Sequence, residues 1–256
     1  MNIINQNNLK QNGGKCLGAG TFGCVLKPNI SCNNNSSKNS NKINNNNNII
    51  SKISTYSDYD IDKLNDIYDE IHIGSKVYKL DKESKYLCPI IKYCKIDIDD
   101  VKLRADIKLK NFKNMDDIDL EYNTFEHEKK CLFNINENFT TINLISHYAG
   151  PDLYQFFKEK HNIFKKYNTL IINNFKQIVN DLLSGLYILH KNKITHKDIK
   201  LNNICILIKN NRPSVRYIDF GLSEDLNELK PSFNNIYNSG TPSYMPPDFI
   251  ILIEMK

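Results

Sequence analysis

The chain has 256 residues, of which 40% are hydrophobic and 25% are charged. This composition is ordinary for a protein with a buried core, and it excludes a disordered or fibrous chain. The formal net charge of +5 arises from 34 basic and 29 acidic residues spread along the sequence, so no focused basic footprint for nucleic acid is expected.

No run of about 18 apolar residues occurs, and the first ten residues lack the apolar core of a signal peptide. We therefore expect no membrane association and an intracellular, cytoplasmic location. The seven cysteines are odd in number and form no CxxC pair, which argues against a disulfide framework and against a zinc site. The sequence predicts reduced, mostly structural thiols.

The first part of the chain predicts a hairpin with an insertion. Residues 24–27 and 49–53 have the composition of strands. Between them, residues 33–48 form a low-complexity, Asn-rich tract that buries too little apolar surface to offset its ordering entropy. We interpret the tract as a loop insertion, with an Asn-rich interaction segment as the alternative.

Residues 58–80 predict a helix, with acidic residues early and lysines late as the helix dipole favours. Residues 86–139 alternate short apolar and charged stretches, which indicates strands and loops. Residues 141–145 predict a strand. This strand leads into Tyr148-Ala149-Gly150-Pro151, whose Gly-Pro step suits a connector between two lobes.

The second half of the chain begins as helix at residues 153–158, and a longer helix is predicted at 175–190 from apolar residues at helical spacing. Strands are predicted at 204–208 and 215–218, around a turn at 209–213. This hairpin would end at Asp219.

The segment from His196 to Asn203, followed by Asp219-Phe220-Gly221, has the residue types and spacing that phosphoryl transfer requires. Asp198 would accept or orient the proton of a substrate hydroxyl, and Lys200 would neutralise phosphate charge. Asn203 and Asp219 would hold a magnesium ion between phosphate oxygens. His196 is interpreted as structural, through a backbone hydrogen bond beneath the site.

A glycine-rich segment matches the pattern GxGxxGxV, in which backbone amides approach phosphates. A Rossmann turn is disfavoured, because a strand rather than a helix follows. The nucleotide-binding residues predicted here are Leu17, Gly18, Ala19, Gly20, Thr21, Phe22, Gly23, Cys24 and Val25.

The likeness of these motifs to those of protein kinases implies a lysine on the third strand that holds the α- and β-phosphates, and Lys52 is the candidate once the Asn-rich loop is set aside. Lys27 competes, but it lies too close to the glycine-rich segment to have passed a hairpin turn. A helical carboxylate should orient this lysine. Glu70 is the candidate, with Asp66 and Glu83 as alternatives.

These motifs together resemble a eukaryotic-type serine/threonine protein kinase. The segment Gly240 to Asp248 resembles the kinase motif G-T-x-x-Y-x-A-P-E, and Lys200 with Thr241 follows the serine/threonine rather than the tyrosine pattern. The segment GAGTFGCVLKPNISC with its polar insert resembles kinases of giant nucleocytoplasmic DNA viruses. That resemblance would place the protein in the host cytoplasm or the virion.

The resemblance implies one α+β kinase domain over residues 1–256. Its bilobal fold would have a small β-rich N-lobe with one main helix (12–147), a hinge (147–152) and an incomplete helical C-lobe (153–256). It also implies ATP and Mg²⁺ as cofactors, a Ser/Thr protein substrate, and His147 and Ala149 as hinge contacts of the nucleotide.

Two of the departures from the kinase pattern concern regulation and the completeness of the fold. Lys197 replaces the usual Arg, so phospho-activation is in doubt. The sequence stops soon after Asp248, which predicts a truncated C-lobe with apolar surface for a partner. The alternatives to an active kinase are a catalytically weak or inactive nucleotide-binding scaffold and, disfavoured by the segment from Gly240, a small-molecule kinase.

Overall fold

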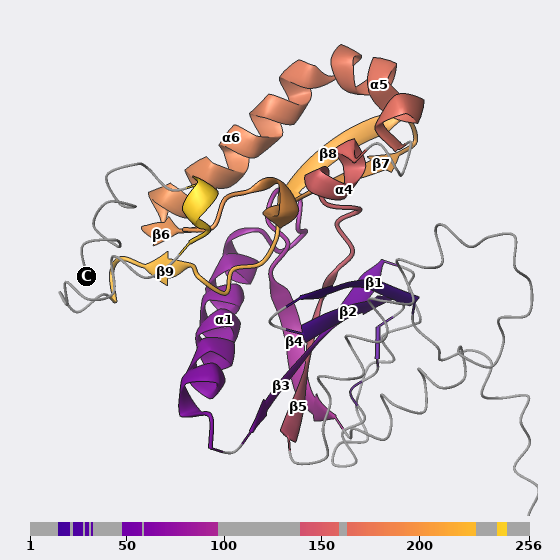
Figure 1. Ribbon diagram of the computed structural model, residues 1–256. Helices are drawn as coiled ribbons and strands as arrows, with labels where there is room; N and C mark the ends of the chain where they lie inside the picture. Colours follow the sequence, from indigo (N-terminus) through magenta and orange to yellow (C-terminus); the bar gives the residue numbers. More distant parts are fainter. Residues whose placement is uncertain are drawn as a thin grey trace, which may run out of the picture. The chain divides into compact units, whose positions relative to one another are not determined.

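The computed structural model describes residues 15–20, 23–27, 29–30, 32, 48–57, 59–96, 139–158, 163–228 and 240–244. The chain divides into two compact units, the first formed by residues 1–65 and 91–148 and the second by residues 66–90 and 149–256. The Asn-rich tract, apart from Asn48, and the strands predicted within 97–138 lie outside the described residues. Figure 1 shows the elements of both units.

The first unit is built on a five-stranded sheet in the order β1-β2-β3-β5-β4. The pairs β1–β2, β2–β3 and β3–β5 are antiparallel. The predicted strands at 24–27, 49–53 and 141–145 are confirmed, and all three are longer than expected. The strands are β1 (Lys15–Gly20), β2 (Gly23–Lys27), β3 (Ile49–Ser57), β4 (Ile90–Ile96) and β5 (Phe139–His147).

The expectation of reduced thiols is wrong for this sheet. Cys32 and Cys94 form a disulfide with their Cα atoms 5.9 Å apart, within the usual range for such bonds, and Cys24 is also disulfide-bonded. Cys32 and Cys94 are separated by 62 residues in the sequence, so no local spacing pattern predicts their disulfide. Cys88 and Cys205, both in the second unit, are not disulfide-bonded and are buried.

Helix α1 (Ile61–Leu80) begins three residues later than the sequence predicts. The reason is an N-terminal cap, because the Oδ1 atom of Asp60 accepts a hydrogen bond of 3.1 Å from the backbone N–H of Lys63. Its buried residues Ile67, Glu70, Ile71, Ile73, Gly74 and Val77 recur at helical spacing.

The described part of the second unit also carries the helices α4 (Leu153–Phe157), α5 (Ile163–Asn173) and α6 (Phe175–Lys191). Helices α4 and α6 lie where the sequence predicts helix, whereas α5 was not predicted. Figure 1 shows α6 lying along the hairpin of β7 (Ile204–Lys209) and β8 (Arg212–Tyr217). Within the described residues, no helix is both long and apolar enough to cross a membrane.

Packing of α6 on β8 depends on a missing side chain. A Cβ atom added to Gly185 would lie 2.9 Å from the Cδ2 and Cε2 atoms of Tyr217, closer than real Cβ contacts allow. The Tyr217 hydroxyl donates a hydrogen bond of 3.3 Å to the carbonyl of Leu182 on α6. Burial in this core raises the pKa of Tyr217 to about 12, so the hydroxyl stays protonated.

The β7–β8 hairpin closes with the two-residue turn Asn210-Asn211, where φ is 51° and 57°. Two residues with positive φ form the turn type whose twist matches paired strands, and Asn tolerates that conformation well. Along β8, Pro213, Val215 and Tyr217 alternate as buried residues with more exposed neighbours.

The connector after β5 crosses the hairpin closely at Gly150. Its φ is 97°, and an added Cβ would overlap the carbonyl of Ile206. The next residues continue this approach, since the backbone N–H of Ile206 donates to the carbonyl of Pro151 at 2.9 Å. Asp152 then caps α4 by accepting from the N–H of Gln155 at 2.8 Å. Glycine is therefore required at position 150.

Candidate active site

Helix α6 delivers the chain to the predicted catalytic loop. The helix ends at Lys191, and the short strand β6 (Ile194–Thr195) follows, paired antiparallel with β9 (Glu224–Asp225). The loop then enters a single 3₁₀ turn, η4 (Leu201–Asn203), before β7. Both ends of the loop are thus held by hydrogen-bonded structure.

The carboxylate of Asp198 lies at the centre of a cluster of polar side chains and is 8% exposed. Its Oδ1 atom accepts a hydrogen bond of 2.7 Å from the Thr241 hydroxyl. Its Oδ2 atom accepts one of 2.7 Å from Asn203 Nδ2 and forms an ion pair of 2.7 Å with Lys200 Nζ. Lys200 Nζ also donates to Thr241 Oγ1 at 2.8 Å, which closes a ring of contacts. The structure therefore brings together three predicted residues, Asp198, Lys200 and Asn203.

Two opposing effects set the pKa of Asp198. Burial raises it, but hydrogen bonds from Lys200 and Thr241, the Lys200 charge and the bond from Asn203 outweigh burial, so the pKa lies below its ordinary value. The carboxylate is therefore ionised at neutral pH. An ionised carboxylate accepts hydrogen bonds and does not donate them.

Thr241 belongs to the site although the sequence analysis used it only as a marker of kinase class. It precedes the 3₁₀ turn η6 (Pro242–Tyr244), and its hydroxyl contacts both Asp198 and Lys200. The motif beginning at Gly240 was the signal that could have identified it. The residues of that motif after Tyr244 lie outside the described part of the chain.

The predicted metal ligands, Asn203 and Asp219, lie on backbone segments that are hydrogen-bonded to each other. Asn203 donates through Nδ2 to the backbone carbonyl of Asp198 at 2.9 Å as well as to its side chain, which directs the amide nitrogen away from any metal. The backbone N–H of Ile218 donates to the carbonyl of Asn203 at 3.0 Å, which places Asp219 beside it. Asp219 itself has a left-handed φ of 60°.

These donors fit magnesium. Asp219 offers a carboxylate and Asn203 a carboxamide oxygen, the hard oxygen ligands that Mg²⁺ prefers together with substrate phosphates. Within the described residues, no group of three or more His, Cys, Asp or Glu side chains forms a metal cage.

His196 has the structural role that the sequence analysis assigned to it. Its ring is almost fully buried, and Nε2 donates to the carbonyl of Ile218 at 3.1 Å. The ring also lies 5.1 Å from that of Phe220, centroid to centroid. Burial lowers the pKa of His196, so the imidazole is neutral at pH 7. His196 therefore ties the catalytic loop to the strand that precedes Asp219.

Lys197, which replaces the usual Arg of the kinase pattern, is already paired. Its Nζ atom lies 2.6 Å from Glu224 Oε1 in the adjacent strand β9. The residue adopts a left-handed φ of 64°. A carboxylate of the chain itself therefore neutralises this cation, and the sequence analysis did not foresee Glu224 as its partner.

Glu70 is buried, 7% exposed, whereas the alternatives Asp66 and Glu83 are exposed. Its carboxylate lies 3.7 Å from the position a Cβ atom would take on Gly221, and Asp219 Oδ1 lies 3.5 Å from the same point. Glu70 thus belongs beside the Asp219 turn. This burial favours Glu70 over the other two carboxylates.

A second contact joins α1 to the segment that follows Asp219. Lys76 Nζ lies 2.6 Å from Asp225 Oδ2 and 2.5 Å from Glu228 Oε1, and His72 Nε2 lies 3.0 Å from Glu228 Oε2. Hydrogen bonding from Lys76 is the main cause that lowers the pKa of Asp225. The network holds the segment after the metal-binding turn against α1.

The predicted nucleotide residues of the first unit lie on adjacent strands. The described part of the glycine-rich segment lies on the paired strands β1 and β2, with a bulge at Leu17, and Thr21 and Phe22 lie outside the described residues. Lys52 lies on β3, opposite Val25 of β2. Lys27 instead places Nζ 3.3 Å from the centre of the Tyr148 ring. This geometry favours Lys52 over Lys27 as the phosphate lysine.

Two predictions stay open. Lys52 and Glu70 belong to different units, each described by itself, so their ion pair stays a prediction. The same holds for the hinge residues. His147 ends β5 opposite Ile49, whereas Ala149 is buried in the second unit with Cys88 and Cys205.

Comparison with known proteins gives the following matches. Residues 12–255 match the family model described as protein kinase domain. Human death-associated protein kinase 2 is 35% identical over 126 residues, which cover 48% of this chain and 31% of that protein. The probable serine/threonine-protein kinase mkcB of Dictyostelium discoideum is 36% identical over 78 residues, covering 30% of this chain and 10% of that protein. The chain therefore spans about a third or less of the relatives it matches.

Proposed function

The chain belongs to the protein kinase family, and from that premise we propose that it transfers the γ-phosphate of ATP to serine or threonine hydroxyls of protein substrates. The observation that carries the proposal is the cluster around Asp198, where a base, a cation and an amide meet within hydrogen-bonding distance. The similarity to mkcB, named a probable serine/threonine-protein kinase, supports the choice of substrate hydroxyl.

The contacts of Asp198 leave room for a substrate. A carboxylate has about four acceptor positions, two on each oxygen. Among the described residues, Asn203 and Lys200 use both positions on Oδ2, and Thr241 uses one on Oδ1. The remaining position on Oδ1 suits a substrate hydroxyl, which passes its proton to Asp198 as the new O–P bond forms and the bond to ADP breaks.

Lys200 supports the same step with its third N–H. An ammonium group has three donors, and two of them contact Asp198 and Thr241. The third is suited to an oxygen of the transferred phosphoryl group, whose charge it would stabilise. Asn203 and Asp219 would hold Mg²⁺, which when bound neutralises charge on the nucleotide phosphates. Lys52 and the glycine-rich segment would hold those phosphates from the first unit.

The test is transfer of labelled phosphate from Mg-ATP to casein, followed by identification of the phosphorylated amino acid. We expect phosphoserine and phosphothreonine. Asp198→Asn should lower the rate about 100- to 10,000-fold, the range for loss of a general base. Asp69→Asn, an exposed carboxylate on α1, is the matched control and should retain the rate. Equal rates for wild type and Asp198→Asn would refute the proposal.

The alternative, a kinase-derived nucleotide-binding scaffold, is favoured by one observation. Three of the acceptor positions on the Asp198 carboxylate are already used by the chain's own side chains. If Mg-ATP raises the melting temperature while no phosphate is transferred to any substrate, the scaffold is the correct function.

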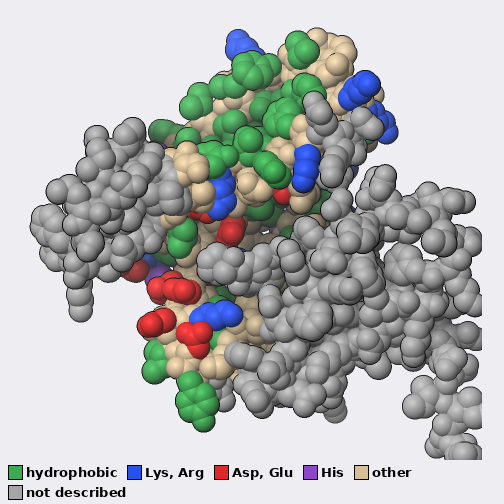
Figure 2. All heavy atoms as spheres, viewed as in Figure 1, with side chains coloured by type: hydrophobic (Ala, Val, Ile, Leu, Met, Phe, Trp, Pro, Cys, Tyr) green, Lys and Arg blue, Asp and Glu red, His purple; other side chains and the backbone are tan. Residues whose placement is uncertain are grey.

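A partner protein that covers the helical lobe is a further part of the proposal. Exposed apolar side chains on α5 and α6, namely Ile172, Phe175, Leu183 and Tyr187, support a partner over the helical lobe. Figure 2 shows hydrophobic side chains gathered over these helices. This partner, the resemblance to giant-virus kinases and the location in cytoplasm or virion remain predictions.

A further inference from the structure

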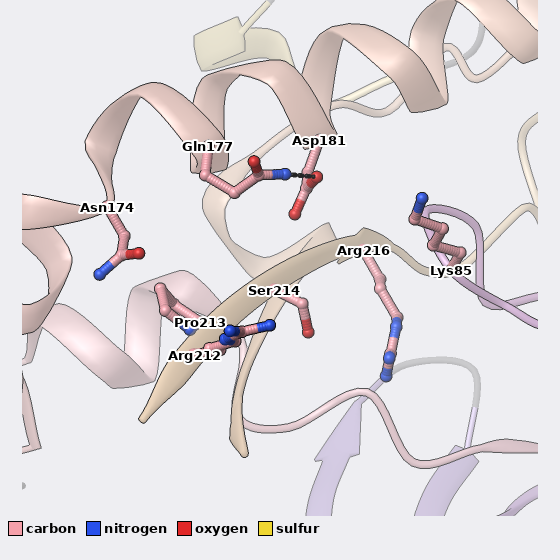
Figure 3. Close-up of a pocket in the computed structure, with 8 residues that line it drawn as sticks. All are labelled: Lys85, Asn174, Gln177, Asp181, Arg212, Pro213, Ser214 and Arg216. Atoms are coloured by element: carbon pink, nitrogen blue, oxygen red, sulfur yellow. Dashed lines mark hydrogen bonds between the residues drawn. The ribbon is translucent and has the colours of Figure 1, made fainter. Parts of the chain in front are cut away.

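A polar pocket of about 420 Å³ lies in the second unit, away from the cluster around Asp198. It is bounded by α6, by β8 and by the turn that precedes β4. Figure 3 shows Gln177 and Asp181 on α6 facing β8, with Asn174 at one end and Lys85 at the other. The lining residues are Lys85, Asn174, Gln177, Asp181, Arg212, Pro213, Ser214 and Arg216.

The strand places its cations on one face. Residues 212, 214 and 216 alternate with the buried Pro213, Val215 and Tyr217, so the two arginines and the serine share the face that lines the pocket. At about 3.3 Å per residue, Arg212 and Arg216 are separated by about 13 Å along the strand.

The side chains that line this pocket carry more positive than negative charge. Three cations face one carboxylate, and none of the three forms an ion pair with a carboxylate among the described residues. Asp181 instead accepts a hydrogen bond of 2.7 Å from Gln177. The Nε atom of Arg216 is buried and has no hydrogen-bond partner. A buried donor without a hydrogen-bond partner destabilises the fold, so the Arg216 guanidinium is not fully hydrogen-bonded by the described residues.

The third cation is held in place by its backbone. Asp81 accepts hydrogen bonds from the backbone N–H groups of Lys85, Tyr86 and Leu87, at 3.0, 2.7 and 2.8 Å. This turn is also bonded to β8, since the N–H of Tyr217 donates to the carbonyl of Tyr86 at 2.9 Å. Lys85 therefore enters the pocket from a fixed turn, although its own side chain is exposed.

We propose that this pocket binds an acidic, extended peptide segment of a protein partner, with two carboxylates four residues apart contacting Arg212 and Arg216. An extended peptide has the same rise per residue as β8, so the spacing of its carboxylates matches that of the arginines. Asn174, Gln177, Asp181 and Ser214 offer the mixed donors and acceptors that suit a peptide backbone.

A nucleic acid is a poorer fit. The lining residues include no aromatic ring on which a base would stack, and Asp181 repels a backbone of closely spaced phosphates. The pocket lies on the same unit as Asp198, and α6 contributes to the pocket and leads to the catalytic loop. Peptide binding is independent of the proposed kinase activity, whereas use of the pocket to select substrates rests on it.

The test is fluorescence anisotropy with a labelled 11-residue peptide of Thr, Ala and Ser that carries Glu at positions 4 and 8. Arg212→Gln/Arg216→Gln should bind it about tenfold or more weakly than wild type. Lys166→Gln/Lys191→Gln removes two exposed charges from α5 and α6, outside the pocket, and should bind like wild type. A peptide with Glu at positions 4 and 5 should bind more weakly than the spaced peptide.

Other outcomes overturn the proposal. An equal loss of peptide affinity in both double variants, or equal affinity for the two peptides, would show that binding is general charge attraction. Tighter binding of a ten-nucleotide oligouridine, lost in Arg212→Gln/Arg216→Gln, would assign the pocket to nucleic acid. Displacement of the peptide by equimolar pyrophosphate would assign it to small anions. If the double variant does not fold, Arg212→Gln alone changes an exposed side chain and should weaken binding about threefold.

A kinase assay separates this proposal from the catalytic one. Fusing the spaced acidic segment to a Ser/Thr peptide should lower its KM with the wild type about tenfold and leave its KM with Arg212→Gln/Arg216→Gln unchanged. The two enzymes should share the same kcat. No turnover of any peptide, with anisotropy as expected, would refute the kinase activity and keep the pocket. Turnover without the KM difference would refute its use in substrate selection.

Discussion

Thr241 offers the sharpest test of the site, because its hydroxyl links Asp198 and Lys200. Thr241→Val removes the hydroxyl and keeps the branched shape. The variant loses the hydrogen bond of 2.7 Å to Asp198 Oδ1 and the one of 2.8 Å from Lys200 Nζ. A hydrogen bond to a charged group contributes about 1.5–3 kcal/mol. If one such bond is lost in the transition state, kcat should fall about 10- to 150-fold.

The expected kinetics distinguish orientation from protonation. Without the Thr241 hydroxyl the pKa of Asp198 rises toward its ordinary value of 3.8, so the carboxylate is still ionised at pH 7.5. We therefore expect a lower kcat, an unchanged KM for ATP and an unchanged pH profile near neutrality. Steady-state assays of phosphate transfer at several pH values measure all three.

Thr241→Ser is the matched control. It restores the hydroxyl and should keep kcat within about threefold of wild type, since only a methyl group is lost. A Thr241→Val enzyme as active as wild type would refute the reasoning. So would a Thr241→Ser enzyme as impaired as Thr241→Val, because the hydroxyl would then have no special role.

Three further predictions concern stability. Gly150→Ala should lower the free energy of unfolding, measured by urea denaturation, by about 2–5 kcal/mol. The reason is that the added Cβ is strained at a left-handed φ and overlaps the Ile206 carbonyl. A loss of less than about 1 kcal/mol would contradict this reasoning. Lys76→Met should lower the free energy of unfolding by about 1 kcal/mol in low salt and by less in 1 M NaCl, because salt screens the ion pairs. Lys82→Met, at an exposed position, should leave the free energy of unfolding unchanged. A loss of stability that does not depend on salt would argue against the ion pairs. His196 is neutral in the fold because burial lowers its pKa, so the unfolded chain binds more protons below the ordinary value of 6.5. Stability should fall as pH drops below 6.5, by up to about 1.4 kcal/mol per pH unit from this residue, and His196→Gln should flatten that slope; equal slopes would exclude the assignment.

The catalytic loop could be predicted from the sequence because its chemistry is local. Asp198, Lys200 and Asn203 lie within six positions, and the fold brings them together as the spacing indicates. Glu70 was less certain, because several carboxylates on or near one helix fit the pattern equally well. Only burial against the turn at Gly221 distinguishes it.

Other features depend on contacts between distant positions, which composition does not encode. The disulfide of Cys32 and Cys94 and the pairing of Lys197 with Glu224 across two short strands are of this kind. Helix α5 was missed for a different reason. Its sequence IFKKYNTLIIN is rich in β-branched, aromatic and Asn residues, which have modest helix propensity.

The contact between Gly185 and Tyr217 has a consequence for related chains. The 2.9 Å approach leaves no room for a methyl group on α6 while the aromatic ring occupies β8. In an alignment of homologues these two positions should therefore covary, with Ala or Ser at 185 accompanied by a smaller residue at 217. An ancestral change at either position would have had to pass through an overpacked or a hollow core, so substitutions here should appear in pairs along the family tree.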